Sequence, residues 1–250
     1  MCTLTVSIEG GAYSLTMNRD ELLERGESGL HQYEAGDKAI LYPRDAQAGG
    51  TWVGVNARGV TLCLLNRYDG HYRVDCPSRG ELIPEGLRHG DEHGVRRWLN
   101  ALDPAPYNPF SLVLISQSGV SRLLWDGQRA IRDQPEAAPW FFMTSSGERF
   151  GEVEATRRQQ FDRWRQSGQP FIGAFPAAHL NCDPADPGSS ILVERSYAHS
   201  KSVVRIDVGQ QELKLHYLFP ESLQAWRQTD RSGVPDYETR TLPVYAHVEA

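Results

Sequence analysis

The sequence lacks the features that mark membrane and nucleic-acid proteins. No apolar run approaches the roughly 18 residues that span a bilayer, and mean hydropathy is −0.50. There is no long lysine or arginine run, and the formal net charge of −6 argues against nucleic acid and anionic membranes as main partners. No signal-peptide pattern follows Met1. We therefore expect a cytoplasmic protein whose partner is a small-molecule ligand or substrate, with the oligomeric state left open.

Metal-binding patterns and domain linkers are missing as well. The four cysteines (Cys2, Cys63, Cys76 and Cys182) form no CxxC pair, and no Cys/His cluster has zinc spacing. We predict no metal site, no resident cofactor and a reduced environment. No Ser/Gly/Pro-rich linker and no repeat divides the 250 residues, of which 40% are hydrophobic. This length and composition predict a single domain over residues 1–250.

What the sequence does contain is a clear strand pattern at its start. Residues 2–8 alternate between apolar and polar side chains, which predicts a half-buried strand with Cys2 on its apolar face. Gly10 and Gly11 then indicate a turn, and residues 13–17 a return strand. Cys2 is thus expected at the start of a strand, where a sheet would hold it at the mouth of a cleft.

The rest of the chain alternates between strand and helix patterns. Residues 18–44 are polar and predict a loop with little regular structure, whereas 152–166 and a segment capped by Asp91 predict helices, with another near Gly80. Together these segments favour an α+β fold, of the layered αββα kind. Residues 49–56 predict a glycine turn that enters a strand, and further strands are expected at 60–66, 110–116, 120–125, 140–144, 190–194, 201–208 and 212–219.

Residue 2 offers a specific chemistry. If Met1 is removed, Cys2 carries both a thiol and a free α-amine, and the amine can accept the thiol proton near neutral pH. The plainer interpretation is a small buried hydrophobe. The polar cluster 18–21 should return close to Cys2, so Asp20 could orient the amine or thiol, while Arg19 could bind a substrate carboxylate or pair with Asp20. Asn66 ends an otherwise apolar row, where a polar side chain needs a partner or a task.

Four ordered motifs carry a resemblance to a known family. They are MCTLTV, MNRDE, GGTWVGVN-ARG-VTLCLLN and SRGELI, all within residues 1–83. The chain resembles the NRDE family, also called the transport and Golgi organisation family, and the likeness continues more weakly toward the C-terminus. That family is similar to cysteine-type N-terminal nucleophile (Ntn) hydrolases, such as bile salt hydrolases and penicillin acylases.

The resemblance implies a fold and a set of site residues. It implies a four-layer αββα sandwich with Cys2 as nucleophile, Asp20 supporting the α-amine and Asn66 helping to form an oxyanion hole. It also exposes departures, because those hydrolases have arginine, asparagine and arginine where this chain has Met17, Ser145 and Lys201. Lysine keeps the charge but loses the bidentate fork. The side chains predicted to bind substrate are those of Asn18, Arg19, Trp52, Ser145 and Lys201.

Two functions follow from this reasoning. The first is a cysteine amidohydrolase or acyltransferase that acts on a small-molecule amide, other than a peptide bond, or on a thioester. The alternative is a non-catalytic carrier of haem or of lipid or acyl ligands, since family members are linked to haem trafficking and secretion. For a carrier, the candidate pocket residues are Trp52, Tyr68, Trp140, His179 and His199. A purely structural role is the third interpretation.

Overall fold

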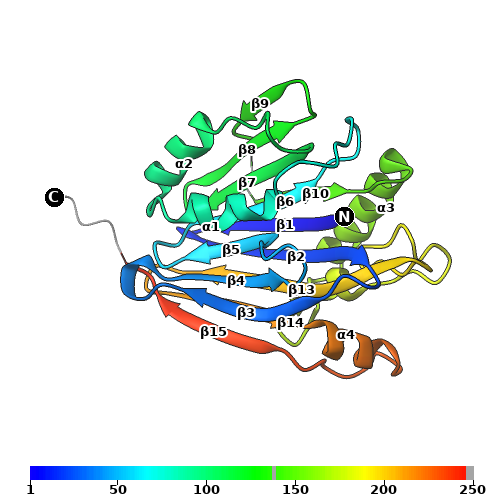
Figure 1. Cartoon of the computed structure of the whole chain (residues 1–250). Coiled ribbons are helices and arrows are strands. Elements are labelled where there is room, and N and C mark those ends of the chain that lie inside the picture. Colours follow the sequence, from blue (N-terminus) through cyan, green and yellow to red (C-terminus); the bar gives the residue numbers. More distant parts are fainter. Residues whose placement is uncertain (137–138, 246–250) are drawn as a thin grey trace.

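Two antiparallel sheets dominate the computed structural model, which describes residues 1–136 and 139–245 (Figure 1). The six-stranded sheet has the order β10-β1-β2-β13-β14-β15, and the seven-stranded sheet runs β3 to β9 in sequence order. Strands of the six-stranded sheet are β1 (Cys2–Glu9), β2 (Ala12–Leu22), β10 (Trp140–Ser145), β13 (Ala198–Val208), β14 (Glu212–Leu218) and β15 (Glu238–Pro243). The seven-stranded sheet contains β3 (Glu27–Tyr33), β4 (Ile40–Asp45), β5 (Val53–Asn56), β6 (Thr61–Asn66), β7 (Phe110–Ser116), β8 (Gly119–Trp125) and β9 (Ala130–Asp133).

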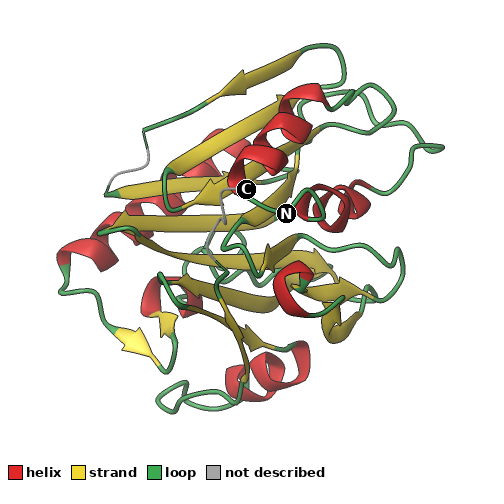
Figure 2. Ribbon diagram, turned by 90° about the vertical axis from the view of Figure 1, so that its left-hand side faces the viewer, coloured by secondary structure: helices red, strands yellow, loops and turns green. Residues whose placement is uncertain are grey.

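Helices cover the outer face of each sheet. The helices α1 (Leu82–Leu87) and α2 (Glu92–Ala101) pack on the seven-stranded sheet, while α3 (Phe150–Gln166) and α4 (Pro220–Arg227) pack on the six-stranded one. Figure 2 shows these helices and strands from a second direction. The order helix, sheet, sheet, helix is the predicted four-layer αββα sandwich, and the α+β class is confirmed. Short elements complete the chain: β11 (Phe171–Ile172), β12 (Phe175–Pro176) and the 3-10 turns Gly36–Lys38, Arg79–Glu81 and Ala177–Leu180.

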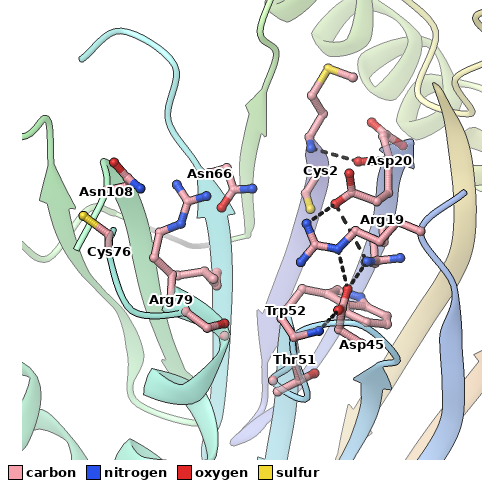
Figure 3. Close-up of a pocket in the computed structure, with 18 of the residues that line it drawn as sticks. Cys2, Arg19, Asp20, Asp45, Thr51, Trp52, Asn66, Cys76, Arg79 and Asn108 are labelled. Atoms are coloured by element: carbon pink, nitrogen blue, oxygen red, sulfur yellow. Dashed lines mark hydrogen bonds and ion pairs between the residues drawn. The ribbon is translucent and has the colours of Figure 1, made fainter. Parts of the chain in front are cut away.

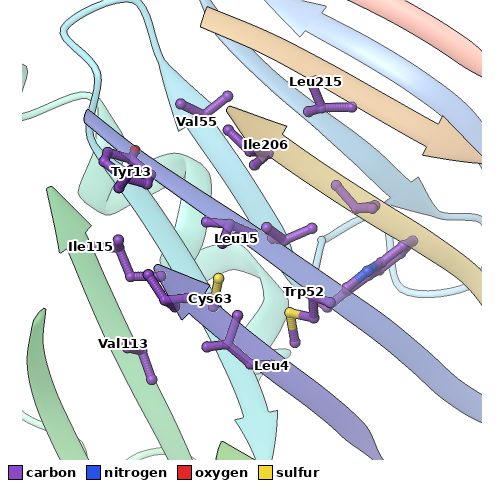
Figure 4. Close-up of a cluster of buried hydrophobic side chains, with 14 of the residues drawn as sticks. Leu4, Tyr13, Leu15, Trp52, Val55, Cys63, Val113, Ile115, Ile206 and Leu215 are labelled. Carbon is purple, nitrogen blue, oxygen red and sulfur yellow. The ribbon is translucent and has the colours of Figure 1, made fainter. Parts of the chain in front are cut away.

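The largest apolar cluster lies between the two sheets (Figure 4). Leu4 of β1 and Leu15 of β2 enter it from one sheet, and Cys63 of β6 and Val113 of β7 enter from the other. Their side chains are at most 1% exposed. Burying such side chains removes apolar surface from water, at roughly 25 cal/mol per Å². No helix in the described part of the chain is long and apolar enough to cross a membrane.

The polar face of β1 is buried too, contrary to the half-buried strand that we predicted. Thr3 and Thr5 are 0% and 3% exposed, because α3 and the turn Ala177–Leu180 lie over this face. Thr3 accepts from Arg157 at 2.9 Å, and the Thr5 hydroxyl bonds His179 Nε2 at 2.8 Å. The alternation therefore predicted correctly which side chains share a face of β1. It did not predict that the polar face is buried, because polar groups can be buried when they are hydrogen-bonded.

The predicted loop over residues 18–44 is wrong. In the structure β2 continues to Leu22, and β3 and β4 form a hairpin at the edge of the seven-stranded sheet. β3 has one strand neighbour only, and most of its side chains are partly or fully exposed, so the sequence reads as polar. An edge strand does not need the apolar pattern by which strands are recognised.

A second error concerns the apolar run 190–194, which is not a strand. Ile191, Leu192 and Val193 are buried, but only Glu194 forms a single bridge. Side chains satisfy the backbone instead: the Ile191 amide donates to Gln160 Oε1 at 2.9 Å and the Val193 amide to Ser200 Oγ at 2.9 Å. A buried irregular segment of this kind has the apolar composition of a strand but lacks the hydrogen-bond ladder to a neighbouring strand, so composition alone does not distinguish the two. By contrast, the β7–β8 hairpin, the helix over 152–166 and the Asp91 cap are confirmed.

Candidate functional site

Cys2 stands at the start of β1 between two neighbours in the sheet. It is opposite Arg19 of β2 on one side and opposite Ser145 of β10 on the other. Its amide nitrogen donates to Ser145 Oγ at 3.1 Å, and its side chain follows the row of Leu4 toward the second sheet. Only 6% of Cys2 is exposed, and it lines a cavity of about 260 Å³. The predicted position at a strand start beside a cleft is therefore what the structure has.

Figure 3 shows the cavity as two facing walls. The first, which we name the Cys2 wall, contains Cys2, Arg19, Asp20, Asp45 and Trp52; the second, the Asn66 wall, contains Asn66, Cys76, Arg79 and Asn108. The Cys2 wall combines β1 and β2 of the six-stranded sheet with β4 and the residue just before β5 of the seven-stranded sheet, whereas the Asn66 wall comes from β6 and from the segments that precede α1 and β7. The site thus joins residues that are distant in the sequence.

Met1 is in place and covers the nucleophile position. Its α-amine donates to the backbone oxygen of Asp20 at 2.8 Å and to Tyr68 Oη at 3.2 Å. Burial lowers the pKa of this amine, but Tyr68, Cys2 and Asp20 outweigh burial and raise it to about 10. Burial also raises the pKa of the Cys2 thiol to about 11. With Met1 attached, Cys2 is therefore a protonated thiol at neutral pH, because its own nitrogen is an amide and not a base.

Asp20 and Arg157 form an ion pair buried between β2 and α3. Both side chains are 0% exposed, and Arg157 Nη2 lies 3.2 Å from Asp20 Oδ2. Ser200 donates to the other carboxylate oxygen at 2.6 Å, and Arg157 Nη1 donates to Thr144 Oγ1 at 2.7 Å. Burial lowers the pKa of Arg157, while Asp20 opposes this effect. The strand alternation places Asp20 on the face opposite the Cys2 thiol, beside the backbone of residues 1 and 2.

Arg19 is committed to partners other than Asp20, which corrects one of its two predicted roles. It forms ion pairs with Glu27 at 3.0 Å and with Asp45, and its guanidinium lies over the Trp52 ring at 4.6 Å. The predicted pairing with Asp20 is wrong, because Arg19 and Asp20 point to opposite faces of β2. Arg19 lines the cavity, but two carboxylates already neutralise it.

The charges around Asp45 close this network. Arg25 Nε contacts Asp45 Oδ2 at 2.8 Å, and the Ala48 amide donates to Oδ1 at 2.7 Å. Burial raises the pKa of Asp45, but the Ala48 amide and the guanidinium groups of Arg25 and Arg19 outweigh burial and hold it below its usual range. At neutral pH this carboxylate is ionised and anchors both arginines.

Two predicted substrate contacts lie away from the cavity. Asn18 is fully buried on the α3 side of β2, where Nδ2 donates to the His179 carbonyl at 2.9 Å and Oδ1 contacts His179 Nδ1 at 2.6 Å. Lys201 Nζ donates to the Leu23 carbonyl at 2.9 Å. Neither side chain lines the cavity: Asn18 joins β2 to the turn Ala177–Leu180, and Lys201 holds the end of β2.

Asn66 differs from the other polar groups because it is free. Within the described residues its side-chain amide has no hydrogen-bond partner, although Asn66 lines the cavity on the wall facing Cys2. Asn108, on the same wall, is engaged: Oδ1 accepts from the Arg73 amide at 2.7 Å and Nδ2 donates to the Arg73 carbonyl at 2.8 Å. Asn66 is thus the amide that can turn to a ligand.

A second, mainly apolar pocket of about 270 Å³ adjoins the first, because Asn66 lines both. Ser145, which accepts from the Cys2 amide, also lines it. Its apolar surface comes from Tyr68, Leu124, Met143 and Phe150. The other proposed pocket residues lie elsewhere: Trp140 packs on Phe161 and Trp164, His179 is buried between Thr5 and Asn18, and His199 lies on β13. In residues 1–136 and 139–245, no three His, Cys, Asp or Glu side chains could hold a metal ion.

Comparison with known proteins identifies the family. The family model described as Transport and Golgi organisation 2 matches residues 1–162. The chain belongs to this family. The predicted membership of the NRDE, or transport and Golgi organisation, family is therefore confirmed. A search of curated proteins gave no match.

Solved structures similar to this member of the Transport and Golgi organisation 2 family include acylases and amidases. The C2A variant of the conjugated bile acid hydrolase from Clostridium perfringens has a TM-score of 0.50 at 10% identity, covering 100% of this chain and 99% of that one. Penicillin V acylase from Agrobacterium tumefaciens gives 0.49 at 14% identity, covering 98% and 92%. The Caenorhabditis elegans ortholog of N-acylethanolamine-hydrolyzing acid amidase gives 0.48 at 11%, covering 82% and 92%. At these identities the likeness shows an Ntn-hydrolase fold and no more.

Sequence reasoning missed the groups that complete the site. Arg157 lies on the predicted helix over 152–166, Glu27 in the predicted loop 18–44 and Asp45 directly after that loop, and nothing in their local sequence pattern indicates burial. Arg79 is different, because it belongs to the SRGELI motif that carried the family resemblance. The motif therefore pointed to Arg79 as a family feature, but nothing in the sequence alone indicates a binding or catalytic role for it.

Proposed function

We propose that the protein is a cysteine amidohydrolase or acyltransferase that acts on a small-molecule amide or thioester once Met1 has been removed. The observation that carries the proposal is the placement of Cys2 at a strand start, across a cavity from an Asn66 amide that has no hydrogen-bond partner among the described residues. The Ntn-hydrolase fold and membership of the Transport and Golgi organisation 2 family support it. No substrate is assigned by these observations.

In the proposed reaction, removal of Met1 converts the Cys2 amide into an α-amine. The thiol proton moves to this amine, and the sulfur attacks the substrate carbonyl carbon to form a C–S bond. Asn66 donates a hydrogen bond to the resulting oxyanion. Collapse breaks the C–N or thioester C–S bond, and the ammonium returns its proton to the leaving group. Water, or an acceptor in a transferase, then attacks the acyl-thioester and releases Cys2.

Asp20 and Ser145 fit positioning roles in this scheme. Ser145 Oγ, which accepts from the Cys2 amide at 3.1 Å, would accept from the amine instead. The backbone of Asp20 pairs with that of Met1, and the Asp20 carboxylate is fixed by Arg157 and Ser200. In this scheme the freed amine keeps Ser145 as one fixed acceptor and would turn to Asp20 as the second, and an amine held in this way keeps its lone pair in one direction, which is what a positioned base requires.

The intact mass of the protein made in cells tests the first requirement. Loss of one methionine is expected, and complete retention would exclude the self-activated mechanism. The processed protein is then incubated with a panel of N-acyl amides and acyl thioesters. We expect turnover in the wild type, accumulation of a covalent acyl adduct on Cys2, and no turnover in Cys2→Ala. Equal turnover in Cys2→Ala, or no hydrolysis of any member by processed protein, would contradict the proposal.

The second candidate is a carrier of an apolar ligand such as an acyl chain, and the apolar pocket beside Asn66 favours it. Leu124, Met143 and Phe150 offer an acyl chain an apolar surface. The two charged residues of the lining, Arg67 and Asp69, pair with each other. Binding of a fluorescent fatty acid, compared between wild type and Met143→Asp, would test it, and a haemin titration followed at the Soret band would test haem. Saturable binding without turnover would favour a carrier over an enzyme.

A further inference from the structure

The charges that line the cavity are unequally neutralised. The three carboxylates of the lining, those of Asp20, Glu21 and Asp45, each lie within ion-pair distance of Arg157, Arg25 or Arg19. The Cys2 wall is therefore internally compensated. A ligand with a positive group would meet no free carboxylate there, and an anionic ligand would meet no free guanidinium.

Arg79, on the Asn66 wall, is in the opposite situation. In the described part of the chain no carboxylate lies within ion-pair distance of its guanidinium, and its hydrogen bond runs from Nη1 to the Pro109 carbonyl at 2.7 Å. Burial lowers the pKa of Arg79, and Tyr68 and Tyr72 oppose this effect only in part. A partly buried cation that is held only by a carbonyl is incompletely compensated, and an anion at its remaining N–H groups would relieve that cost.

The position of Arg79 is fixed by a contact between two family motifs. A Cβ added at Gly50 of the GGTW motif would lie 2.6 Å from the carbonyl carbon of Gly80 in the SRGELI motif, so only glycine permits this approach. The Thr51 amide donates to the Gly80 carbonyl at 3.1 Å and ties the two segments together. Arg79 is thus held from its backbone and from Pro109, and little side-chain entropy remains to be lost on binding.

We propose that Arg79 is an anion-binding residue that pairs with a carboxylate or phosphate group of the ligand in the Cys2 cavity. In Figure 3 its side chain extends along the Asn66 wall beside Asn66, facing the gap that separates it from Cys2. To call this ligand a substrate rests on the proposed function. The proposed substrate class is then restricted to small anionic molecules. A guanidinium suits both acids, because its planar fork matches either one.

Alkylation of Cys2 tests the proposal without any substrate. Iodoacetate and iodoacetamide react at the same carbon and differ in charge, so the ratio of their rates reports the local attraction for an anion. We measure this ratio at Cys2 by peptide mass spectrometry in wild type, Arg79→Gln and Arg79→Lys. The matched control is Arg73→Gln, because Arg73 also donates to carbonyls of the 105–109 segment but does not line the cavity.

We expect the iodoacetate to iodoacetamide ratio to fall about tenfold in Arg79→Gln, to be partly kept in Arg79→Lys and to be unchanged in Arg73→Gln. An unchanged ratio in Arg79→Gln would overturn the proposal. Should the buried thiol react slowly with both reagents, Cys76, which lines the same cavity, provides the second reporter. Since no step requires turnover, a failure here is distinct from a failure of the proposed hydrolase activity.

Calorimetric titrations of Cys2→Ala with inorganic phosphate and with succinate separate the two acids. Saturable binding of one of them that is lost in Arg79→Gln assigns the anion, and raised salt should weaken it. Failure of both anions to bind at millimolar concentration, or binding that Arg79→Gln leaves intact, would count against Arg79 as the anion site.

Discussion

The two walls of the cavity use the same residue types in opposite ways. On the Cys2 wall, Arg19, Asp20 and Asp45 are all paired, and their partners include residues of α3 and of the β3–β4 hairpin. On the Asn66 wall, the amide of Asn66 has no protein partner among the described residues, and Arg79 has only a carbonyl. One wall is held rigid by interactions made inside the protein, and the other keeps its donors for a ligand.

This difference shows why charge alone does not mark a binding residue. Arg19 belongs to the NRDE motif and lines the cavity, yet Glu27 and Asp45 already satisfy it. Arg79 has the weaker sequence signal and the more available guanidinium. A polar group is available to a ligand when no protein group already satisfies its hydrogen bonds or charge. Only the folded structure shows whether such a protein partner is present.

The largest effect should come from breaking the buried pair behind the Cys2 wall. Arg157→Met leaves Asp20 buried without its counter-charge, and we expect a loss of about 3–5 kcal/mol in the free energy of unfolding. The control is Arg158→Met on the same helix, whose exposed pair with Glu154 should contribute under about 1 kcal/mol. Urea unfolding measures both. Equal losses in the two variants would show that the Asp20–Arg157 pair does not support this wall.

On the facing wall, loss of Asn66 should affect activity and not stability. With a substrate in hand, Asn66→Ala should reduce turnover about 10²–10³-fold, the effect of removing one oxyanion donor. Its melting temperature should stay near that of the wild type, since no protein hydrogen bond is lost. Asn108→Ala is the matched control with the reverse behaviour: it breaks both bonds to Arg73 and should lower the melting temperature. A stability loss in Asn66→Ala alone would reverse the assignment of the two asparagines.

The sequence predicted the geometry of the Cys2 wall better than its charges. Alternation placed Cys2 at a strand start, and the turn at Gly10 and Gly11 brought the residues around Arg19 back beside it, as the pairing of Cys2 with Arg19 shows. These are local relations. The pairing of Asp20 with Arg157 joins residues 137 positions apart, and Glu27 lies on β3, which has the exposed pattern of an edge strand. Long-range pairing and one-sided strands leave no periodic signal in the sequence.

The layer beneath the Cys2 wall should respond to pH through His179. Asn18 Oδ1 contacts Nδ1, and burial, followed by Arg205, lowers the pKa of the ring to about 3. The ring is therefore neutral at pH 7, with Nδ1 donating to Asn18 and Nε2 accepting from the Thr5 hydroxyl. The unfolded chain binds this proton below its ordinary pKa near 6.5, and stability is lost as pH falls from there toward 3. Between pH 7 and pH 5 the expected loss is about 2 kcal/mol.

Chemical denaturation at the two pH values, in wild type and in His179→Gln, isolates this contribution. The variant loses hydrogen bonds and should be less stable than the wild type at pH 7. Its free energy of unfolding should, however, fall by about 2 kcal/mol less than that of the wild type between pH 7 and pH 5. The Asn66 wall has no equivalent buried histidine among the residues that line the cavity in the described chain. An unchanged pH dependence in His179→Gln would mean that the pKa of the ring in the folded protein is close to its value in the unfolded chain.

The smallest effect should come from Ser145, which joins the Cys2 wall to the apolar pocket. Ser145→Ala removes the acceptor of the Cys2 amide, and we expect a loss of about 1 kcal/mol in the free energy of unfolding. Ser111→Ala is the matched control, because Ser111 is buried at 1% exposure, lines the same pocket and makes no side-chain hydrogen bond in the described structure. Its unfolding should be nearly unchanged. If processed protein turns substrate over, Ser145→Ala should also lower kcat more than Ser111→Ala does, because the amine of Cys2 then loses an acceptor that fixes its direction.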